Sequence, residues 1–221
     1  MRLILARHGK AAHNAAYEQY LRGDRHALYD KLDLEAPLVG IGVQQARAAG
    51  TYLRDHGIAP DVVSLSPAVR AQQTWAEYGL PDVTTIVEPR LREQAGGVFD
   101  WLPLSATQAQ REAYTREAKR SLDARPPAGE SIREHLARVQ AWLRETMAQH
   151  PEVTMLAIAH YGTIGLLGML CEALQPEAYL AHRPDHLTPG YGSLLGYRWH
   201  QGRWEHDFLF RNPLSDASGE A

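Results

Sequence analysis

Cysteine is nearly absent from this sequence. Cys171 is the single cysteine among 221 residues, so no internal disulfide can form, and a reducing cytoplasm is the expected location. An excess of positive charge is also absent, since the formal net charge is -3. Nucleic-acid binders usually carry a basic face, so this class of partner is not expected. A weakly acidic total still allows local positive charge around a small anionic ligand.

The sequence also lacks the features of membrane and nucleotide-binding proteins. Its most apolar stretch, residues 153–174, contains His160 and Glu172 and has no flanking basic cluster, which predicts a buried strand followed by a buried helix rather than a membrane span. Residues 1–5 are too short for the core of a signal peptide. No G-x-G-x-x-G follows the first apolar run, which argues against a nucleotide-binding dehydrogenase.

Apolar runs alternate with helical patterns along most of the chain. Such alternation predicts an α/β protein, a three-layer α/β/α sandwich with a mainly parallel sheet. A serine before proline predicts a helix start at Ser66-Pro67, and Ser131 with Glu134 predicts a capping box. The predicted strands are residues 2–6, 61–65, 84–87 and 153–159, with a closing hairpin over 193–199 and 204–210; the predicted helices cover about 43–57, 108–122 and 131–147.

Hydrophobic residues make up 44% of the chain, enough for one ordinary core. We predict a single domain over residues 1–211 and a flexible tail over 212–221. Two cap-like insertions are expected near 15–35 and 94–123, where loops usually set specificity. Their aromatic and charged side chains are candidates for substrate contact: Tyr17, Tyr20, Arg22, Arg25, His26 and Tyr29 in the first, and Phe99, Trp101 and Tyr114 in the second.

Polar side chains follow the predicted strands at their carboxyl ends, where parallel sheets bind ligands. They are Arg7, His8, Arg70, Glu93 and His160. Arginine presents a planar fork of donors to phosphate oxygens, and a neutral histidine can be a nucleophile. A carboxyl group with a raised pKa can protonate a departing alkoxide. This set is chemically sufficient for phosphoryl transfer without a metal or a cofactor.

Each member of this set also has an ordinary structural explanation. A single histidine after a strand is more often structural than catalytic, and many loop glutamates are solvated. Glu130 and Ser131 are expected to be helix-start residues, and Lys10 is expected to face solvent. The remaining histidines show no metal-ligand spacing. His182, Arg183 and His186 precede the last strands, where a plain loop is expected and contact with the tail of a substrate is the alternative.

Six short motifs follow one another in a fixed order along the chain. Residues 5–9 read Leu-Ala-Arg-His-Gly, with Asn14 seven residues after Arg7. The other motifs are 36–39 with Gly42, Gln45 and Ala46; 65–67 with Arg70-Ala71 and Gln73-Thr74; 91–94 with Gly97; Pro127, 129–131 and Arg138; and Ala159-His160 with Gly162. Their order resembles that of one known family, the histidine phosphatase superfamily, also called phosphoglycerate mutase-like.

The resemblance implies a role for each matching residue. His8 would be the nucleophile, and Arg7, Arg70 and His160 would hold the phosphoryl oxygens. Asn14 would add a hydrogen bond to them, and Glu93 would be the proton donor that later activates water. These roles agree with the chemistry of the strand-end set. The implied activity is that of a histidine acid phosphatase-type phosphomonoesterase acting through phosphohistidine.

Three positions depart from the family pattern and bear on substrate choice: Lys10 in place of a common glutamate, Tyr161 in place of a common glycine, and Gly192-Ser193 where asparagine often precedes serine. Two alternatives stay open, a phosphoglycerate-type mutase and a catalytically weak phospho-ligand or protein-binding module on the same fold. The expected partner is a small phosphorylated substrate, with no nucleic acid and no membrane. A homodimer is an open alternative.

Overall fold

The computed structural model describes residues 1–24, 33–100 and 104–215 of the chain. Four of the cap residues named above, Arg25, His26, Tyr29 and Trp101, lie outside the described residues. None of the helices within the described ranges combines the length and the apolar character needed to cross a membrane.

A six-stranded sheet with the order β3-β2-β4-β1-β5-β6 forms the centre of the fold. Its parallel part contains β1 (Arg2–Arg7), β2 (Val62–Leu65), β3 (Thr84–Val87) and β4 (Thr154–Ala159). The predicted hairpin, β5 (Leu194–His200) and β6 (Arg203–Phe210), continues the sheet in antiparallel fashion beside β1. The mainly parallel sheet expected from the sequence is therefore confirmed.

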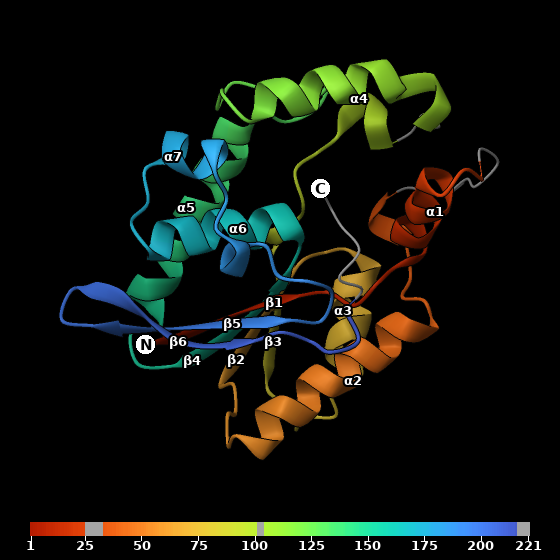
Figure 1. Ribbon diagram of the computed structural model, residues 1–221. Coiled ribbons are helices and arrows are strands. Elements are labelled where there is room, and N and C mark those ends of the chain that lie inside the picture. Colours follow the sequence, from red (N-terminus) through yellow and green to blue (C-terminus); the bar gives the residue numbers. More distant parts are fainter. Residues whose placement is uncertain (25–32, 101–103, 216–221) are drawn as a thin grey trace.

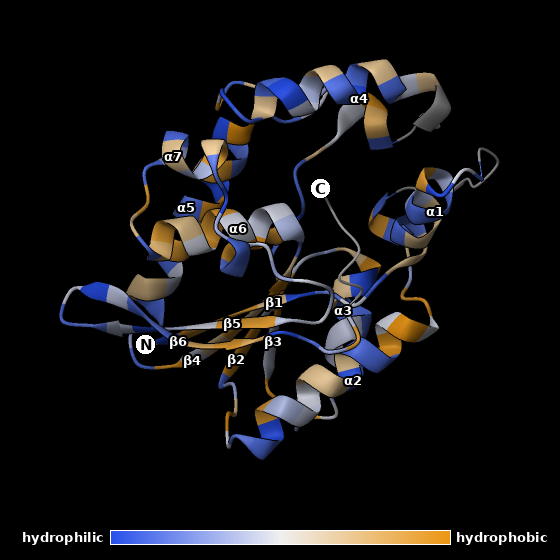
Figure 2. Cartoon of the chain, viewed as in Figure 1, coloured by the Kyte–Doolittle hydropathy of each residue, from blue (hydrophilic) through white to orange (hydrophobic). Residues whose placement is uncertain are grey.

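Helices cover both faces of this sheet, which gives the three layers (Figure 1). Leu3 and Leu5 of β1 pack with α5 (Ile132–Gln149), α6 (Tyr161–Cys171) and α7 (Pro176–Ala181). The alternate residues Ile4 and Ala6 pack with α2 (Gly40–Asp55) and α3 (Val69–Ala76). A parallel strand that is buried on both faces needs a continuous apolar run, which explains the hydrophobic colour of the central strands in Figure 2.

The local signals at α5 and at α3 had different outcomes. At α5 the capping box is present, because the Ser131 hydroxyl accepts from the Glu134 amide and the Glu134 carboxylate accepts from the Ser131 amide. At α3 the predicted start at Ser66-Pro67 is wrong. The helix begins at Val69 after Ala68, and the Ser66 hydroxyl instead bonds His160 at 2.6 Å.

Two helices, α1 (Ala12–Leu21) and α4 (Leu104–Ala118), stand outside the sandwich, with α1 beyond the carboxyl end of β1 (Figure 1). They fall within or beside the segments expected to be caps. The Tyr20 hydroxyl of α1 donates to Gln108 Oε1 of α4 at 3.3 Å, so these two segments contact each other. Short 3-10 turns lie at Asp33–Glu35, Pro89–Leu91, Gly97–Asp100 and Asp185–Leu187.

The boundary predicted at residue 212 falls too early. Asn212 is 3% exposed, and its side-chain amide donates to the carbonyls of Gln45 and Gly192. Gln45 in turn donates to the Leu214 carbonyl at 2.8 Å, and the Ser215 hydroxyl donates to the Tyr191 carbonyl at 2.7 Å. Residues 212–215 are therefore bonded to the body of the protein, and residues 216–221 lie outside the described part.

Candidate active site

The carboxyl ends of β1, β2 and β4 meet at one edge of the sheet. The register pairs Arg7 with Ala159 and Leu65 with Ile158, so the next residues, His8, Ser66 and His160, emerge together. The backbone amides of His8 and Ser66 continue the ladder by donating to the carbonyls of Ala159 and Ile158. Residues that are 58 to 152 positions apart in the sequence thus lie side by side without any loop having to place them.

The hydrogen bonds of His8 define which ring nitrogen carries the proton. Nδ1 lies 2.7 Å from the Gly9 carbonyl, which can only accept, so Nδ1 is the protonated nitrogen. Nε2 accepts from Arg70 Nε at 3.2 Å and therefore presents its lone pair. Burial, together with the charges of Arg70 and Arg7, lowers the pKa of His8 well below its usual value. His8 is thus a neutral imidazole with a nucleophilic Nε2 at neutral pH.

Arg70 connects the two histidines of the site. Its side chain is 2% exposed, and its Nη2 donates to His160 Nδ1 at 3.2 Å. Because His160 Nδ1 accepts, its Nε2 carries the proton and donates to the Ser66 hydroxyl. Burial also lowers the pKa of His160 well below the usual value, with Arg70 as the next cause. The two rings meet edge to face, 5.0 Å apart.

Arg7 is held by aromatic rings and by the loop before β5. Its guanidinium lies 3.9 Å from the centre of the Tyr191 ring and 5.1 Å from that of Tyr161, and its Nη1 donates to the Pro189 carbonyl. Tyr161, which stands where the family pattern has a glycine, thus makes a cation-π contact with Arg7. Gly192, with φ of +69°, donates its amide to the Arg7 carbonyl, a backbone conformation that favours glycine.

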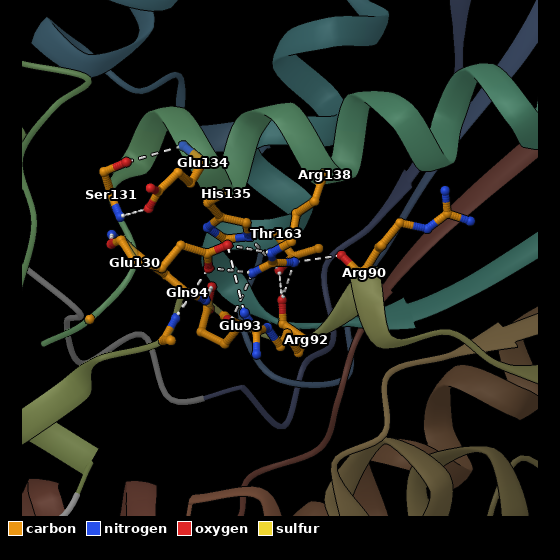
Figure 3. Close-up of polar contacts among 12 residues, drawn as sticks. Arg90, Arg92, Glu93, Gln94, Glu130, Ser131, Glu134, His135, Arg138 and Thr163 are labelled. Atoms are coloured by element: carbon orange, nitrogen blue, oxygen red, sulfur yellow. Dashed lines mark hydrogen bonds and ion pairs between the residues drawn. The ribbon is translucent and has the colours of Figure 1, made fainter.

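Glu93 lies in the loop after β3, near enough to Arg70 for the arginine charge to offset part of the rise that burial causes in the pKa of the Glu93 carboxyl. Figure 3 shows Glu93 among the polar contacts of this loop. Its two carboxylate oxygens accept from the amides of Gln94 at 2.9 Å and Gly162 at 2.8 Å. Burial raises its pKa, and the two amide bonds offset part of that rise. A Cβ at position 162 would lie 2.6 Å from Glu93 Oε1, so any other residue there would push the carboxylate out of this position. A carboxyl with a raised pKa is suited to carry a proton as a general acid.

Asn14, expected to bind a phosphoryl oxygen, forms hydrogen bonds with residues at the start of α1. Its Oδ1 accepts from the Ala11 amide at the start of α1, and its Nδ2 donates to His13 Nε2 at 2.9 Å. The expectation that Lys10 faces solvent is wrong. Its side chain is buried, and its Nζ lies 2.5 Å from the Glu18 carboxylate. The ion pair compensates for the burial of its charge.

Two residues that sequence reasoning missed, His13 and Asp33, border the site. The ring centre of His13 lies 6.5 Å from that of His8, and its Nε2 lies 3.5 Å from Asp33 Oδ1. Burial, followed by the charge of Arg70, lowers the pKa of His13 to about 4. Neither residue belongs to a family landmark. The only available signal was that His13 directly precedes Asn14.

Asp33 contacts the guanidinium that was expected to bind phosphate. Arg70 Nη2 donates to Asp33 Oδ2 at 2.9 Å, and Arg70 Nη1 donates to the Asp33 carbonyl. A phosphate at Arg70 must displace or approach this carboxylate, which costs hydrogen bonds and like-charge repulsion. We expect Asp33→Asn to bind orthophosphate about tenfold more tightly, equal to about 1.4 kcal/mol, as measured by calorimetry. Unchanged or weaker binding would instead mean that the carboxylate serves to hold Arg70 in place.

The buried histidines also predict how stability depends on pH. His8, His13, His135 and His160 all have lowered pKa values in the fold, so the unfolded chain binds more protons below about pH 6.5. The contribution of these histidines to the free energy of unfolding is therefore fully present above that pH. It is lost as the pH falls toward their pKa values in the folded protein. His13 alone, shifted from 6.5 to about 4, corresponds to about 3 kcal/mol.

Thermal unfolding should therefore move to lower temperature from neutral pH down to about 4. The raised pKa values of Glu93 and Asp100 act in the opposite direction and reduce this loss at acidic pH. His13→Gln should flatten the pH dependence of Tm, since it removes one of the four groups. A Tm that rises on acidification from pH 6.5 would contradict this account.

Comparisons with known proteins agree with this geometry. Residues 3–210 match the family model described as "Histidine phosphatase superfamily (branch 1)". A 2,3-bisphosphoglycerate-dependent phosphoglycerate mutase of Rhizobium etli is 32% identical over 225 residues, covering 98% of this chain and 97% of the relative. Another mutase of the same name, from a Methylobacterium species, is 32% identical over 185 residues, covering 79% of this chain and 82% of its own.

Solved structures share the fold at lower identity. The alpha-ribazole phosphatase of Shigella flexneri superposes with a TM-score of 0.74 at 24% identity, covering 97% of this chain and 98% of its own. A mycobacterial glucosyl-3-phosphoglycerate phosphatase gives a TM-score of 0.72 at 23% identity, covering 95% and 98%. The family match spans nearly the whole described domain, and every strand-end side chain named above lies within it. This chain therefore belongs to the histidine phosphatase superfamily.

Proposed function

We propose that this chain hydrolyses phosphomonoesters through a phosphohistidine formed on His8, without a metal. The observation that carries the proposal is the tautomer of His8: Nδ1 is tied to the Gly9 carbonyl, and the unprotonated Nε2 faces the Arg70 guanidinium. A phosphoryl group bound by Arg70 would therefore have a neutral nucleophile next to it.

The reaction proceeds in two balanced steps. His8 Nε2 forms a bond to phosphorus while the ester P–O bond breaks, and Glu93 gives its proton to the departing alkoxide. Water then attacks phospho-His8, Glu93 takes back a proton, and orthophosphate leaves with His8 neutral again. Arg7 and Arg70 bring fixed positive charge to the oxygens, with a further hydrogen bond from Asn14.

His160 can assist only if its Nδ1 carries a proton, whereas that nitrogen accepts from Arg70 in the present arrangement. Ser66 makes the change feasible, because its hydroxyl can donate as well as accept. If the Ser66 hydroxyl donates to His160 Nε2, the neutral ring carries its proton on Nδ1 and can donate to a phosphoryl oxygen. The 2.6 Å bond between these groups is compatible with either direction.

A mutase is the second candidate, favoured by the names of the curated relatives. It would use the same first step but return the phosphoryl group to a second hydroxyl. Lys10, buried and paired with Glu18, lies two residues after His8, at the position where the family pattern has a glutamate, and this departure weakens the mutase candidate. The third candidate, a phospho-ligand-binding module, would bind orthophosphate without forming phosphohistidine.

The deciding experiment is release of orthophosphate from a panel of phosphomonoesters with EDTA present, beside isomerisation of phosphoglycerates. Steady release in EDTA supports the metal-independent hydrolase, and the best ester begins to define the substrate. Isomerisation without net release supports the mutase. Phosphate binding with neither reaction supports the binding module. Within the described ranges no group of three or more His, Cys, Asp and Glu is placed to hold a metal ion.

A cytoplasmic location and a small phosphorylated substrate, rather than nucleic acid or membrane, belong to the same proposal. They are supported by the single cysteine, Cys171, which is buried and forms no disulfide, and by the net charge of -3. The homodimer stays a prediction that light scattering on the purified protein would test.

A further inference from the structure

The loop that carries Glu93 is fixed by a side chain from a different element. We call residues 90–95 the acid loop. Arg138 of α5 donates from Nη1 to the carbonyls of Arg90 at 2.5 Å and Arg92 at 2.9 Å, and from Nη2 to the carbonyl of Glu93 at 3.0 Å (Figure 3). One guanidinium thus donates hydrogen bonds to three carbonyls within four consecutive residues, and these bonds set the direction of the backbone at Glu93.

Glu130 completes this arrangement from the other side. Its carboxylate accepts from Arg138 Nε at 2.7 Å and from Nη2 at 2.8 Å, a bidentate pair in which both side chains are mostly buried. Its backbone also holds the acid loop, since its carbonyl accepts from Gln94 Nε2 at 2.6 Å and its amide donates to the Ala95 carbonyl at 2.9 Å. The acid loop is therefore bonded on both sides of Glu93.

A third support comes from α6. The Thr163 hydroxyl donates to the Arg92 carbonyl at 2.9 Å, and His135 of α5 donates from Nε2 to that hydroxyl at 3.0 Å. His135 is a neutral ring, because burial lowers its pKa well below the usual value. These bonds attach the acid loop to the same helix start that offers the Gly162 amide to the Glu93 carboxylate.

We infer that Arg138 and Glu130 are positioning residues that hold the Glu93 carboxyl where it can protonate the leaving group. The inference rests on the proposed function. Packing alone does not require this pair, since buried ion pairs contribute little net stability compared with apolar residues of similar volume. Their contribution lies in geometry, because a displacement of about 1 Å at a reacting group can cost about 10²-fold in rate.

The test compares esters that differ in their need for an acid. An alkyl phosphate, such as glycerol 2-phosphate, must have its leaving alkoxide protonated, whereas p-nitrophenyl phosphate releases a stable phenolate. We expect Arg138→Lys to lower kcat/KM for the alkyl ester by about 10²-fold and to leave the aryl ester nearly unchanged. Lysine keeps the charge but cannot form the bidentate pair or reach three carbonyls. Glu130→Gln should give the same pattern with a smaller loss.

The matched control is Arg133→Lys on the same helix. Arg133 pairs with Asp123 at the surface, far more exposed than Arg138, and its replacement should alter neither ester. In the Glu93→Gln background, adding Arg138→Lys should cause no further loss of kcat/KM that is specific to the alkyl ester. The reason is that Arg138 and Glu130 act through Glu93. Orthovanadate binding and Tm report whether each variant is folded.

The outcomes separate the inference from the proposed function. Equal losses for both esters in folded variants, or no loss for either, would overturn the positioning role while leaving the hydrolase intact. An additional leaving-group-specific loss in the Glu93→Gln background would also overturn it. If Arg138→Lys does not fold, Glu130→Gln decides by the same criteria. A wild type that releases phosphate from neither ester would instead overturn the proposed function, and this inference with it.

Discussion

Replacing His8 with alanine is expected to lower kcat/KM for phosphate release by about 10⁴-fold to 10⁶-fold, the range found when a nucleophile is removed from an interdependent catalytic group. The reason is that Nε2 of His8 is unprotonated and lies against the Arg70 guanidinium, since the ring proton is held on Nδ1 by the Gly9 carbonyl. The measurement is phosphate release with EDTA present, for the ester that wild type hydrolyses best.

Two further readouts make this result specific. The wild type, quenched in alkali because phosphohistidine is labile to acid, should gain the mass of one phosphoryl group, and His8→Ala should not. Orthophosphate binding should persist in the variant, since Arg7 and Arg70 stay in place. Substantial activity in His8→Ala would mean that another group is the nucleophile, and His160 is the first to test because its ring centre lies 5.0 Å from that of His8.

Glu93→Gln is expected to lower kcat/KM for alkyl phosphates by about 10²-fold to 10⁴-fold, the usual contribution of a general acid, while aryl phosphates change little. Glutamine preserves the size of the side chain and can still accept one of the amide bonds, but it carries no transferable proton. Both esters should be measured under the same conditions, since kcat/KM reports the steps through phosphoryl transfer to His8.

The same group predicts a pH dependence whose sign follows from its pKa. Because burial raises the pKa of Glu93, the protonated acid persists to higher pH than in an ordinary glutamate, and it is lost as the pH rises through that value. The ratio of alkyl to aryl kcat/KM should therefore fall with rising pH in the wild type, when it is measured where both esters are dianions. Taking the ratio cancels the titration of enzyme groups that both reactions need. In Glu93→Gln this ratio should be low and independent of pH. A ratio that rises with pH would show that Glu93 acts as a base in the first step.

The sequence by itself determined the fold class and the position of the strand-end residues. The apolar runs at 2–6 and 153–159 are continuous because those strands are buried on both faces, and a parallel sheet must then bring the residues after them to one edge. That rule alone brings together His8 and His160. Local chemistry was also readable where the partners are near in sequence, as in the Ser131 and Glu134 capping box.

Only the tertiary structure decided which groups surround these residues and in what state. Three hydrogen bonds join residues that are distant in sequence: Arg70 to Asp33, His160 to Ser66, and Asn212 to Gln45. The bond to His160 also explains why Ser66 does not start a helix. Packing also decides that Lys10 is buried in an ion pair with Glu18, and that Arg138 donates hydrogen bonds to the acid loop. Hydrophobic periodicity records which face of an element is buried, but a hydrogen bond depends on angstrom-level distances between elements, and those are set when the layers pack.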